Sequence, residues 1–467
     1  MRRKLCSPAR EIAAIALVAA LTASFSPRVA DADEAAGGAS APAPAIFPDL
    51  EAVRSQWEAE GWLLHGQATF IQEAHPAFHA PYRGGASMNS SAEGRNTFSA
   101  DLIMGRKLWR GAELIFDPQV SRGFGLSTTT GIAAFPSGEA FRLGSEDPKI
   151  YVAHAILRQT IALSGETVEG DRSDPLRLDE PLPKERITLT GGTMSLYDIF
   201  DGNTYAHDPR TQFMNWAFVS ASAFDFAADA RGYTNGAAAE YDDGAWGLRA
   251  GGYQVARTVN GLELDPDAAH AWQMLGEADR FYRLAGRPGA ARLLYGAERT
   301  RSQGYDALVA NGFANFDRNP NGWRMKHMVV INAEQELADD LGAFARASWG
   351  DGRSQSWMFT EQDRAVSAGV SLKGARWDRG EDTVGLAANV GWISAPHRRF
   401  LEAGGIGFIA GDGALAYAPE VATEIYYDLG LAPGFHAAAD YQFVLNPAYN
   451  SDRGPVHVFG IRLHARF

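Results

Sequence analysis

Cysteine is almost absent from this sequence. The one cysteine among 467 residues, Cys6, lies in an N-terminal stretch with the features of an export signal, so the exported chain would contain none. This excludes a disulfide-stapled secreted domain and a cysteine-ligated metal centre, and no cofactor is expected. An exported chain without cross-links must be stabilised by strand pairing and burial.

Long hydrophobic runs and an excess of positive charge are absent as well. After residue 32 no stretch of 18 apolar residues occurs, which excludes a transmembrane helix from the rest of the chain. The formal net charge is −13, and it becomes −16 when residues 1–32, with five basic and two acidic side chains, are removed. Because binding to phosphates of nucleic acid requires a basic surface, nucleic acid is not an expected partner.

Common enzyme signatures are also missing. The sequence contains no G-x-S-x-G, no H-E-x-x-H and no phosphate-binding P-loop. We therefore expect no enzyme. The alternative stays open, because the residues of a catalytic site can lie far apart in sequence.

The N-terminal 60 residues differ in composition from the rest. Residues 1–32 are predicted to be a signal peptide, with a basic start (MRRKLCSPAR), an apolar core (IAAIALVAALTASF) and the small residue Ala32 at the cleavage site. Residues 33–60 are predicted to form a periplasmic linker and a short amphipathic helix. Leu50, Val53 and Trp57 would form the apolar face of that helix, which would end at Gly61.

From residue 61 to the end, hydrophobicity alternates with a period of two, as in strands with one apolar face. In LGAFARASW, residues 341–349, every second side chain from Leu341 to Trp349 is apolar, and residues 97–104, 246–250, 384–392 and 435–443 follow the same pattern. The runs are about ten residues long, which is longer than most strands of soluble proteins. With 50 glycines and 11% aromatic residues, the pattern favours an all-β closed structure.

Short segments rich in glycine or aspartate join pairs of these runs, and long irregular segments separate the pairs. Predicted turns lie at 109–113, 242–246, 286–290, 338–342, 378–382 and 431–435, and predicted long loops at 164–185, 254–270, 312–322 and 394–418. Residues 268–284 could be helical, but the turn and apolar run that follow favour a hairpin. A unit of two strands, a turn and a loop takes roughly 50 residues, so residues 61–467 predict a transmembrane antiparallel β-barrel of about 16 strands.

The last strand supports a barrel. Phe459, Ile461, Leu463 and Phe467 share one face, and polar side chains such as His464 occupy the other. A sheet that spans a bilayer must close on itself, because lipid cannot satisfy an open edge. A terminal aromatic suits the aromatic belt at the membrane boundary. The alternative, an edge strand of a soluble sandwich, accounts neither for the signal nor for the long strands.

Six stretches spread over the exported chain resemble the carbohydrate-selective porin family, the OprB-like porins of Gram-negative outer membranes. They are HGQATFIQEAHPAF (65–78), LWRGAELIFDPQVSRGFGLS (108–127), AAFPSGEAFRLG (133–144), AHAILRQTIAL (153–163), DIFDGNTYAHDPRTQFMNW (198–216) and DYQFVLNPAYNSDRGPVHVFGIRLHARF (440–467). The resemblance implies a 16-stranded barrel, monomeric or loosely trimeric, that passes sugars by diffusion. A short helix before the first strand also fits this family.

Polar side chains are concentrated in DIFDGNTYAHDPRT. The candidates are Asp198, Asp201, Asn203, His207, Asp208 and Arg210. Carboxylates, amides and guanidinium groups can pair with vicinal hydroxyls, so this segment is a candidate sugar-binding cluster facing the lumen. The alternative is a loop network that folds inward and braces the wall, and one segment could do both.

Charges of both signs recur at positions predicted to face the lumen. They are Arg158, Arg249, Glu277, Arg324, Lys326, Arg346, Glu424, Arg462 and Arg466. Opposed charges would create a transverse field that favours polar solutes. The alternative is solvated wall charge without selectivity. Tyr253 and Tyr426 could stack on sugar rings, although packing is the commoner role of such residues.

The sequence therefore predicts a multi-pass β-barrel of the Gram-negative outer membrane that allows passive diffusion of mono- or small oligosaccharides into the periplasm. Its expected partners are permeating sugars, the outer-membrane bilayer and the barrel assembly machinery, and the chain would be a monomer or a loose homotrimer. Three alternatives remain: a general non-selective porin, an outer-membrane barrel enzyme of lipase or protease type, and a structural or adhesive barrel with a blocked lumen.

Overall fold

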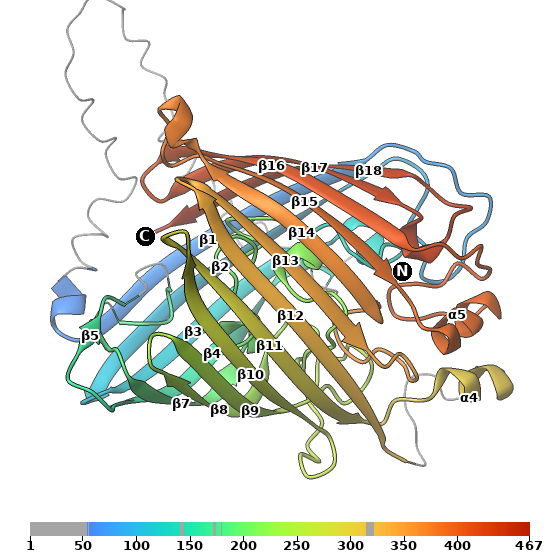
Figure 1. Ribbon diagram of the computed structural model, residues 1–467. Coiled ribbons are helices and arrows are strands. Elements are labelled where there is room, and N and C mark those ends of the chain that lie inside the picture. The colour runs from blue at the N-terminus through green and yellow to red at the C-terminus, as the bar shows by residue number, and fades with distance from the viewer. Residues whose placement is uncertain (1–53, 55, 141–143, 171–173, 179, 314–321) are drawn as a thin grey trace, which may run out of the picture. The chain divides into compact units, whose positions relative to one another are not determined.

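The computed structural model describes residues 54, 56–140, 144–170, 174–178, 180–313 and 322–467. Within these residues sixteen strands form one closed antiparallel barrel, and the last strand pairs with the first (Figure 1). This confirms the predicted fold class and strand number. The predicted signal peptide, most of the linker and the start of the N-terminal helix lie outside the described residues.

The barrel strands are of unequal length. They are β1 (Trp62–His75), β2 (Glu93–Trp109), β3 (Ala112–Gly123), β4 (Ser145–Ala162), β7 (Arg186–Met194), β8 (Thr234–Asp242), β9 (Trp246–Gln254), β10 (Trp272–Leu284), β11 (Arg287–Thr300), β12 (Arg324–Ala338), β13 (Leu341–Gly350), β14 (Arg364–Lys373), β15 (Thr383–Trp392), β16 (Glu420–Ala432), β17 (Phe435–Leu445) and β18 (Val456–Arg466). A separate two-stranded sheet consists of β5 (Thr167–Val168) and β6 (Leu182–Pro183). Residues 272–284 are a strand, so the hairpin interpretation of that region is confirmed.

Each barrel strand carries exposed apolar side chains on one face and buried side chains on the other, as the alternation predicts. On β13, Trp349 is exposed on the outside of the barrel, whereas Phe344, Arg346 and Ser348 are buried on the lumen side. On β18, Leu463 is exposed. Because a strand places successive side chains on opposite faces, the period of two puts apolar residues toward lipid and polar residues toward the lumen.

The two ends of the barrel carry connections of different length. One end, which also carries the last residue of β18, has short connections at 110–111, 243–245, 285–286, 339–340, 374–382 and 433–434. The other end has longer ones at 76–92, 124–144, 195–233, 255–271, 301–323, 351–363, 393–419 and 446–455. Outer-membrane barrels have short periplasmic turns and long extracellular loops, which identifies the two ends.

Two sequence predictions about connections need correction. The segment predicted as the long loop 164–185 lies at the short-turn end, because it joins β4 to β7 and an antiparallel strand order fixes the end of each connection. The turn predicted at 286–290 lies at 285–286, where Ala285 and Gly286 both have positive φ. The other predicted turns fall between the expected strands.

The barrel closes at a seam where β1 pairs with β18. Phe70 of β1 lies opposite Leu463 of β18, and the backbones of Gly66 and Phe467 hydrogen-bond to each other in both directions. A Cβ atom at Gly66 would overlap the ring of Phe467. A side chain at this position would displace the terminal aromatic ring, which packs directly on the backbone of the first strand.

In the described residues, helices are few and short. They are α3 (Trp216–Val219), α4 (Tyr305–Ala310) and α5 (Ala395–Glu402), with 3-10 turns η1 (Leu126–Thr128), η2 (Leu196–Asp198), η3 (Gly374–Trp377) and η4 (Pro447–Tyr449). Residues 56–59 are also helical, in agreement with the predicted N-terminal helix where it is described. No helix in the described part of the chain is both long and apolar enough to cross a membrane.

Candidate functional site

The connection between β7 and β8, residues 195–233, folds into the lumen. It begins with a capping box: the Ser195 hydroxyl oxygen accepts a hydrogen bond from the Tyr197 backbone N–H, and the Asp198 carboxylate accepts one from the Ser195 backbone N–H. Farther along the same segment, the Asn215 side chain caps the N-terminus of α3. From Phe213 to Ala230 every side chain is buried. We call residues 195–233 the lumen loop.

Asp201 anchors the lumen loop to one wall. Its carboxylate accepts hydrogen bonds from Arg346 Nε of β13 at 3.1 Å and from Asn332 Nδ2 of β12 at 2.7 Å. Its backbone N–H donates to Glu277 of β10 at 2.8 Å. Arg346 also donates to two backbone carbonyls of the loop, Phe218 at 2.6 Å and Ala206 at 2.8 Å. Both charges are fully buried and fully partnered, which is the condition under which a buried ion pair is tolerated.

Glu424 and Arg462 anchor the lumen loop to the opposite wall. The Glu424 carboxylate of β16 accepts the backbone N–H groups of Met214 at 2.6 Å and Asn215 at 2.9 Å. Arg462 of β18 donates to the loop carbonyl of Gln212 at 2.6 Å. The loop thus crosses the lumen from β10–β13 to β16–β18.

These contacts show what most of the predicted site residues do. Seven of them form the contacts between the lumen loop and the wall: Asp201, Asn203, Glu277, Lys326, Arg346, Glu424 and Arg462. Asp198 contacts His154 of β4. Arg249 pairs along the wall with Glu240, Glu277 and Asp279. Arg324 is exposed at the extracellular end of β12 beside Gly304, and Arg466 is exposed at the periplasmic end. Tyr253 and Tyr426 are buried packing residues, against Phe200 and Phe213.

Arg210 lies where the lumen loop approaches β2. Its guanidinium pairs with Asp101 and, at 2.9 Å, with Glu139 of the 124–144 loop. Burial alone would lower the pKa of Arg210, but the two carboxylates raise it well above its usual value. Arg210 therefore stays charged beside the lumen wall.

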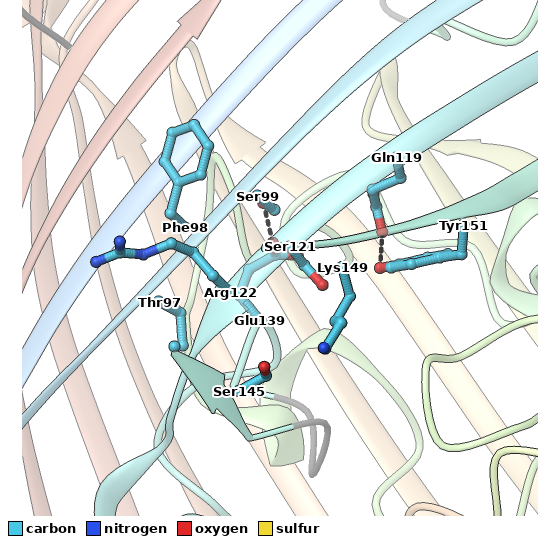
Figure 2. A pocket seen from close by; sticks show the side chains of 11 residues that line it. Thr97, Phe98, Ser99, Gln119, Ser121, Arg122, Glu139, Ser145, Lys149 and Tyr151 are labelled. Carbon is cyan, nitrogen blue, oxygen red and sulfur yellow. Dashed lines mark hydrogen bonds between the residues drawn. The ribbon is translucent and has the colours of Figure 1, made fainter. Parts of the chain in front are cut away.

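A pocket lined by polar side chains lies on the wall of β2, β3 and β4 next to this cluster (Figure 2). Its lining includes Ser99, Gln119, Glu139, Lys149 and Tyr151. The Ser99 hydroxyl donates to Glu139 at 2.6 Å, and the Tyr151 hydroxyl donates to Gln119. The pocket thus offers hydroxyl, amide, carboxylate and ammonium groups at one place, and these are the groups that pair with sugar hydroxyls.

An aromatic pair borders this pocket. The rings of Tyr151 and Tyr233 lie 6.0 Å apart, and Arg231 Cζ lies 4.9 Å from the centroid of Tyr151. His154 lies edge-on to Tyr233, with a centroid distance of 5.3 Å. Sequence reasoning missed these residues, because Tyr151 and Gln119 are isolated polar positions in strands whose partners only the fold brings together.

A second inward-folded segment lies toward the periplasm. Residues 174–178 of the β4–β7 connection place Leu176 and Leu178 in the same buried apolar cluster as inward-facing Leu63 and Ile156. Arg158 of β4 donates to the carbonyl of Leu176 at 2.7 Å. The predicted lumen residue Arg158 therefore holds a periplasmic segment against the inside of the wall.

A closed sixteen-stranded barrel with short turns at one end and a long loop folded across its lumen defines the class of outer-membrane porins. The sequence profile of the family described as "Carbohydrate-selective porin, OprB family" matches residues 87–467. The chain belongs to this family and is an outer-membrane sugar porin.

Solved structures share the fold. OprB of Pseudomonas putida in its high-pH structure has 15% sequence identity and a TM-score of 0.68, over 92% of this chain and 99% of that chain. The outer membrane channel DcaP of Acinetobacter baumannii has 11% identity and a TM-score of 0.50, over 87% of this chain and 97% of that chain. No curated protein matches the sequence significantly.

Proposed function

We propose that mono- or small oligosaccharides diffuse through this porin along the wall formed by β2, β3 and β4, between that wall and Arg210 of the lumen loop. The observation that carries the proposal is the pocket of Figure 2, where Ser99, Glu139, Lys149 and Tyr151 converge. On the opposite wall, the charges of Lys326 on β12 and Arg346 on β13 are already engaged by the lumen loop.

Weak binding is what a passive channel requires. A solute must be attracted enough to enter and released quickly enough to leave. Glu139 and Arg210 are already paired with each other at 2.9 Å, so a sugar hydroxyl can exchange with existing hydrogen bonds without leaving a buried charge unpaired. Lys149 is exposed and adds a mobile donor at the pocket edge.

The periplasmic segment 174–178 would form the exit of this route. Its Arg177 pairs with Asp174 at 3.3 Å, next to Arg158. Solutes leaving the polar wall would pass these charges, so the exit favours polar over apolar molecules. The chain would act as a monomer or a loose homotrimer, inserted by the barrel assembly machinery.

We expect no catalysis, in keeping with the porin fold and the missing enzyme signatures. The second candidate function is a general, non-selective porin. It predicts that sugars and amino acids of similar mass cross at rates set by size alone. A barrel enzyme would convert a sugar or lipid into product, and an adhesive barrel with a blocked lumen would pass neither solute.

A liposome-swelling series tests the proposal. Sugars of increasing size and amino acids of similar mass are compared for the wild-type protein, Lys149→Met and Glu139→Gln. Both variants should change the sugar-to-amino-acid rate ratio severalfold without abolishing flux, because each removes one charged partner from the pocket.

Arg122→Met is the matched control. Arg122 borders the same pocket, but its side chain extends away from Ser99 and Lys149 (Figure 2) and belongs to the outward phase of β3. It should leave the ratio unchanged. Equal ratios for all variants in correctly folded barrels would refute the route along β2–β4.

A further inference from the structure

Cationic and aromatic side chains gather at the extracellular ends of β10, β11 and β12, where the outward face of the strands meets the loops. On β11 and β12 the odd-numbered residues point away from the lumen, as the exposed Leu293 and Ile331 show. Arg299 occupies the last outward position of β11, and Arg301 and Trp323 lie just beyond the strand ends. We call these three residues the outer arginine site.

The two guanidinium groups share one indole ring. Cζ of Arg301 lies 4.2 Å from the Trp323 centroid, and Cζ of Arg299 lies 5.6 Å from it. The ring of His270 stacks on the same tryptophan, with centroids 5.7 Å apart and an interplanar angle of 19°. Cation–π contacts of this kind hold the two arginines next to each other despite their like charge.

The positive charge of this site is incompletely neutralised by the protein. Within the described residues, Arg299 makes no ion pair and donates no side-chain hydrogen bond. Arg301 has one carboxylate neighbour there, Asp265, with 3.9 Å between Nε and Oδ2, and its Nε has no hydrogen-bond partner. By contrast, the buried lumen residue Arg346 donates to four acceptors.

The site lies at the edge of the lipid-facing surface. Arg299 is paired in register with Trp272 and Met325, and the next outward residues toward the periplasm are Ala297, Tyr295 and Leu293. At about 3.4 Å per residue, Arg299 lies roughly 20 Å along the strand from Leu293. It is therefore placed where the apolar band ends and lipid head groups begin, in the outer leaflet.

We propose that Arg299 and Arg301, held on Trp323, bind a phosphate of a phosphorylated glycolipid in the outer leaflet. A guanidinium offers a planar fork of N–H donors that matches phosphate oxygens, and two adjacent forks can enclose one phosphate. The outward face is the part of the barrel that lipid touches and permeating solutes do not. The function is therefore separate from sugar passage.

Native mass spectrometry of the protein as purified from outer membranes tests the site. A purified bis-phosphorylated glycolipid is added to the wild-type protein and to the variant Arg299→Ala/Arg301→Ala, and the bound fraction is measured. The variant should bind about tenfold more weakly, the effect of losing at least one charge-assisted contact. Arg299→Lys/Arg301→Lys should fall between them, because charge remains but the fork is lost.

Arg280→Ala is the matched control. Arg280 also lies over an outward tryptophan, with Cζ 4.9 Å from the Trp246 centroid, but at the periplasmic end of the barrel. It should retain wild-type binding, and all variants should keep the heat-modifiable gel mobility of a folded barrel. Equal binding of a dephosphorylated glycolipid, or an equal loss in the Arg280 variant, would overturn the proposal. So would a wild-type preference for a glycerophospholipid or for inorganic phosphate over the glycolipid.

Discussion

Replacing Arg346 by methionine should loosen the lumen loop while leaving the barrel closed. Arg346 is 2% exposed and donates to Asp201 Oδ1 and to the carbonyls of Phe218, Ala206 and Asp201. Methionine keeps much of the volume but leaves the Asp201 carboxylate without its counter-charge. Removing one partner of a buried ion pair costs about 3–5 kcal/mol.

That cost falls on docking of the loop and not on strand pairing. The backbone ladders between β13 and its neighbours do not involve the guanidinium. Since 1.4 kcal/mol is a factor of ten, a loss of about 3 kcal/mol raises the undocked-to-docked ratio of the loop by roughly two orders of magnitude. The channel should then fluctuate in width, whereas barrel stability should change little.

Single-channel recording in planar bilayers measures this effect. Arg346→Met should give a noisier and larger conductance than wild type, with unchanged heat-modifiability on gels. Arg186→Met is the control, because Arg186 on the lumen side of β7 pairs within the wall, with Asp242 of β8 at 3.1 Å. A quiet, wild-type conductance for Arg346→Met, or equal noise in both variants, would refute the view that Arg346 braces the loop.

Three further predictions concern other parts of the chain. Leu463→Asp places a charge on the lipid face at a cost of up to about 2 kcal/mol, so it should reduce the yield of heat-modifiable barrel. His464→Ser changes a side chain on the lumen side and should reduce this yield only slightly. Equal yields for the two variants would show that the face assignment is wrong. His397 in α5 is buried 3.1 Å from Asp363; burial alone would lower the pKa of His397, but this carboxylate raises it to about 9. Because the folded value lies above the ordinary one, the protonated imidazole stabilises the extracellular loops fully below about pH 6.5, and this stabilisation is lost as the pH rises through about 9. Limited proteolysis of α5 should therefore accelerate from pH 7 to pH 10 in wild type but not in His397→Gln, and parallel profiles would contradict this. The mature protein in the outer membrane should begin directly after Ala32, and N-terminal sequencing that starts at the initiator methionine would contradict it.

The fold could be predicted from the sequence because the membrane imposes a simple rule on every strand. A period of two, a strand length near ten and the turn residues are local signals, and they suffice for strand number and for the orientation of Leu463 and Trp349. The misplacement of 164–185 had a physical cause. Length alone suggested a loop, whereas the end of the barrel to which a connection belongs depends on counting every strand before it.

The lumen could be predicted only in part. The sequence picked out Asp201, Arg346 and Glu424 as lumen residues but left open whether they bind solute or brace the wall. Their partners are backbone groups far along the chain, such as Met214 N–H for Glu424, and a pattern of residues carries no signal for such pairs. For the same reason the pocket beside Tyr151 was missed, since its members come from three strands and one loop.

The position of the lumen loop in the chain has a consequence for the order of assembly. The loop ends at residue 233, but its anchors Glu424 and Arg462 belong to the last strands, and β18 must also pair with β1. Contacts between residues so distant in sequence form late and slowly, because the entropy of closing a long chain must first be overcome. Until the last strands arrive, the loop groups that pair with Glu424 and Arg462 have no partner on that side of the lumen. We therefore expect the channel to acquire its selectivity in the same step in which the barrel closes, so that a half-assembled barrel is neither sealed nor selective.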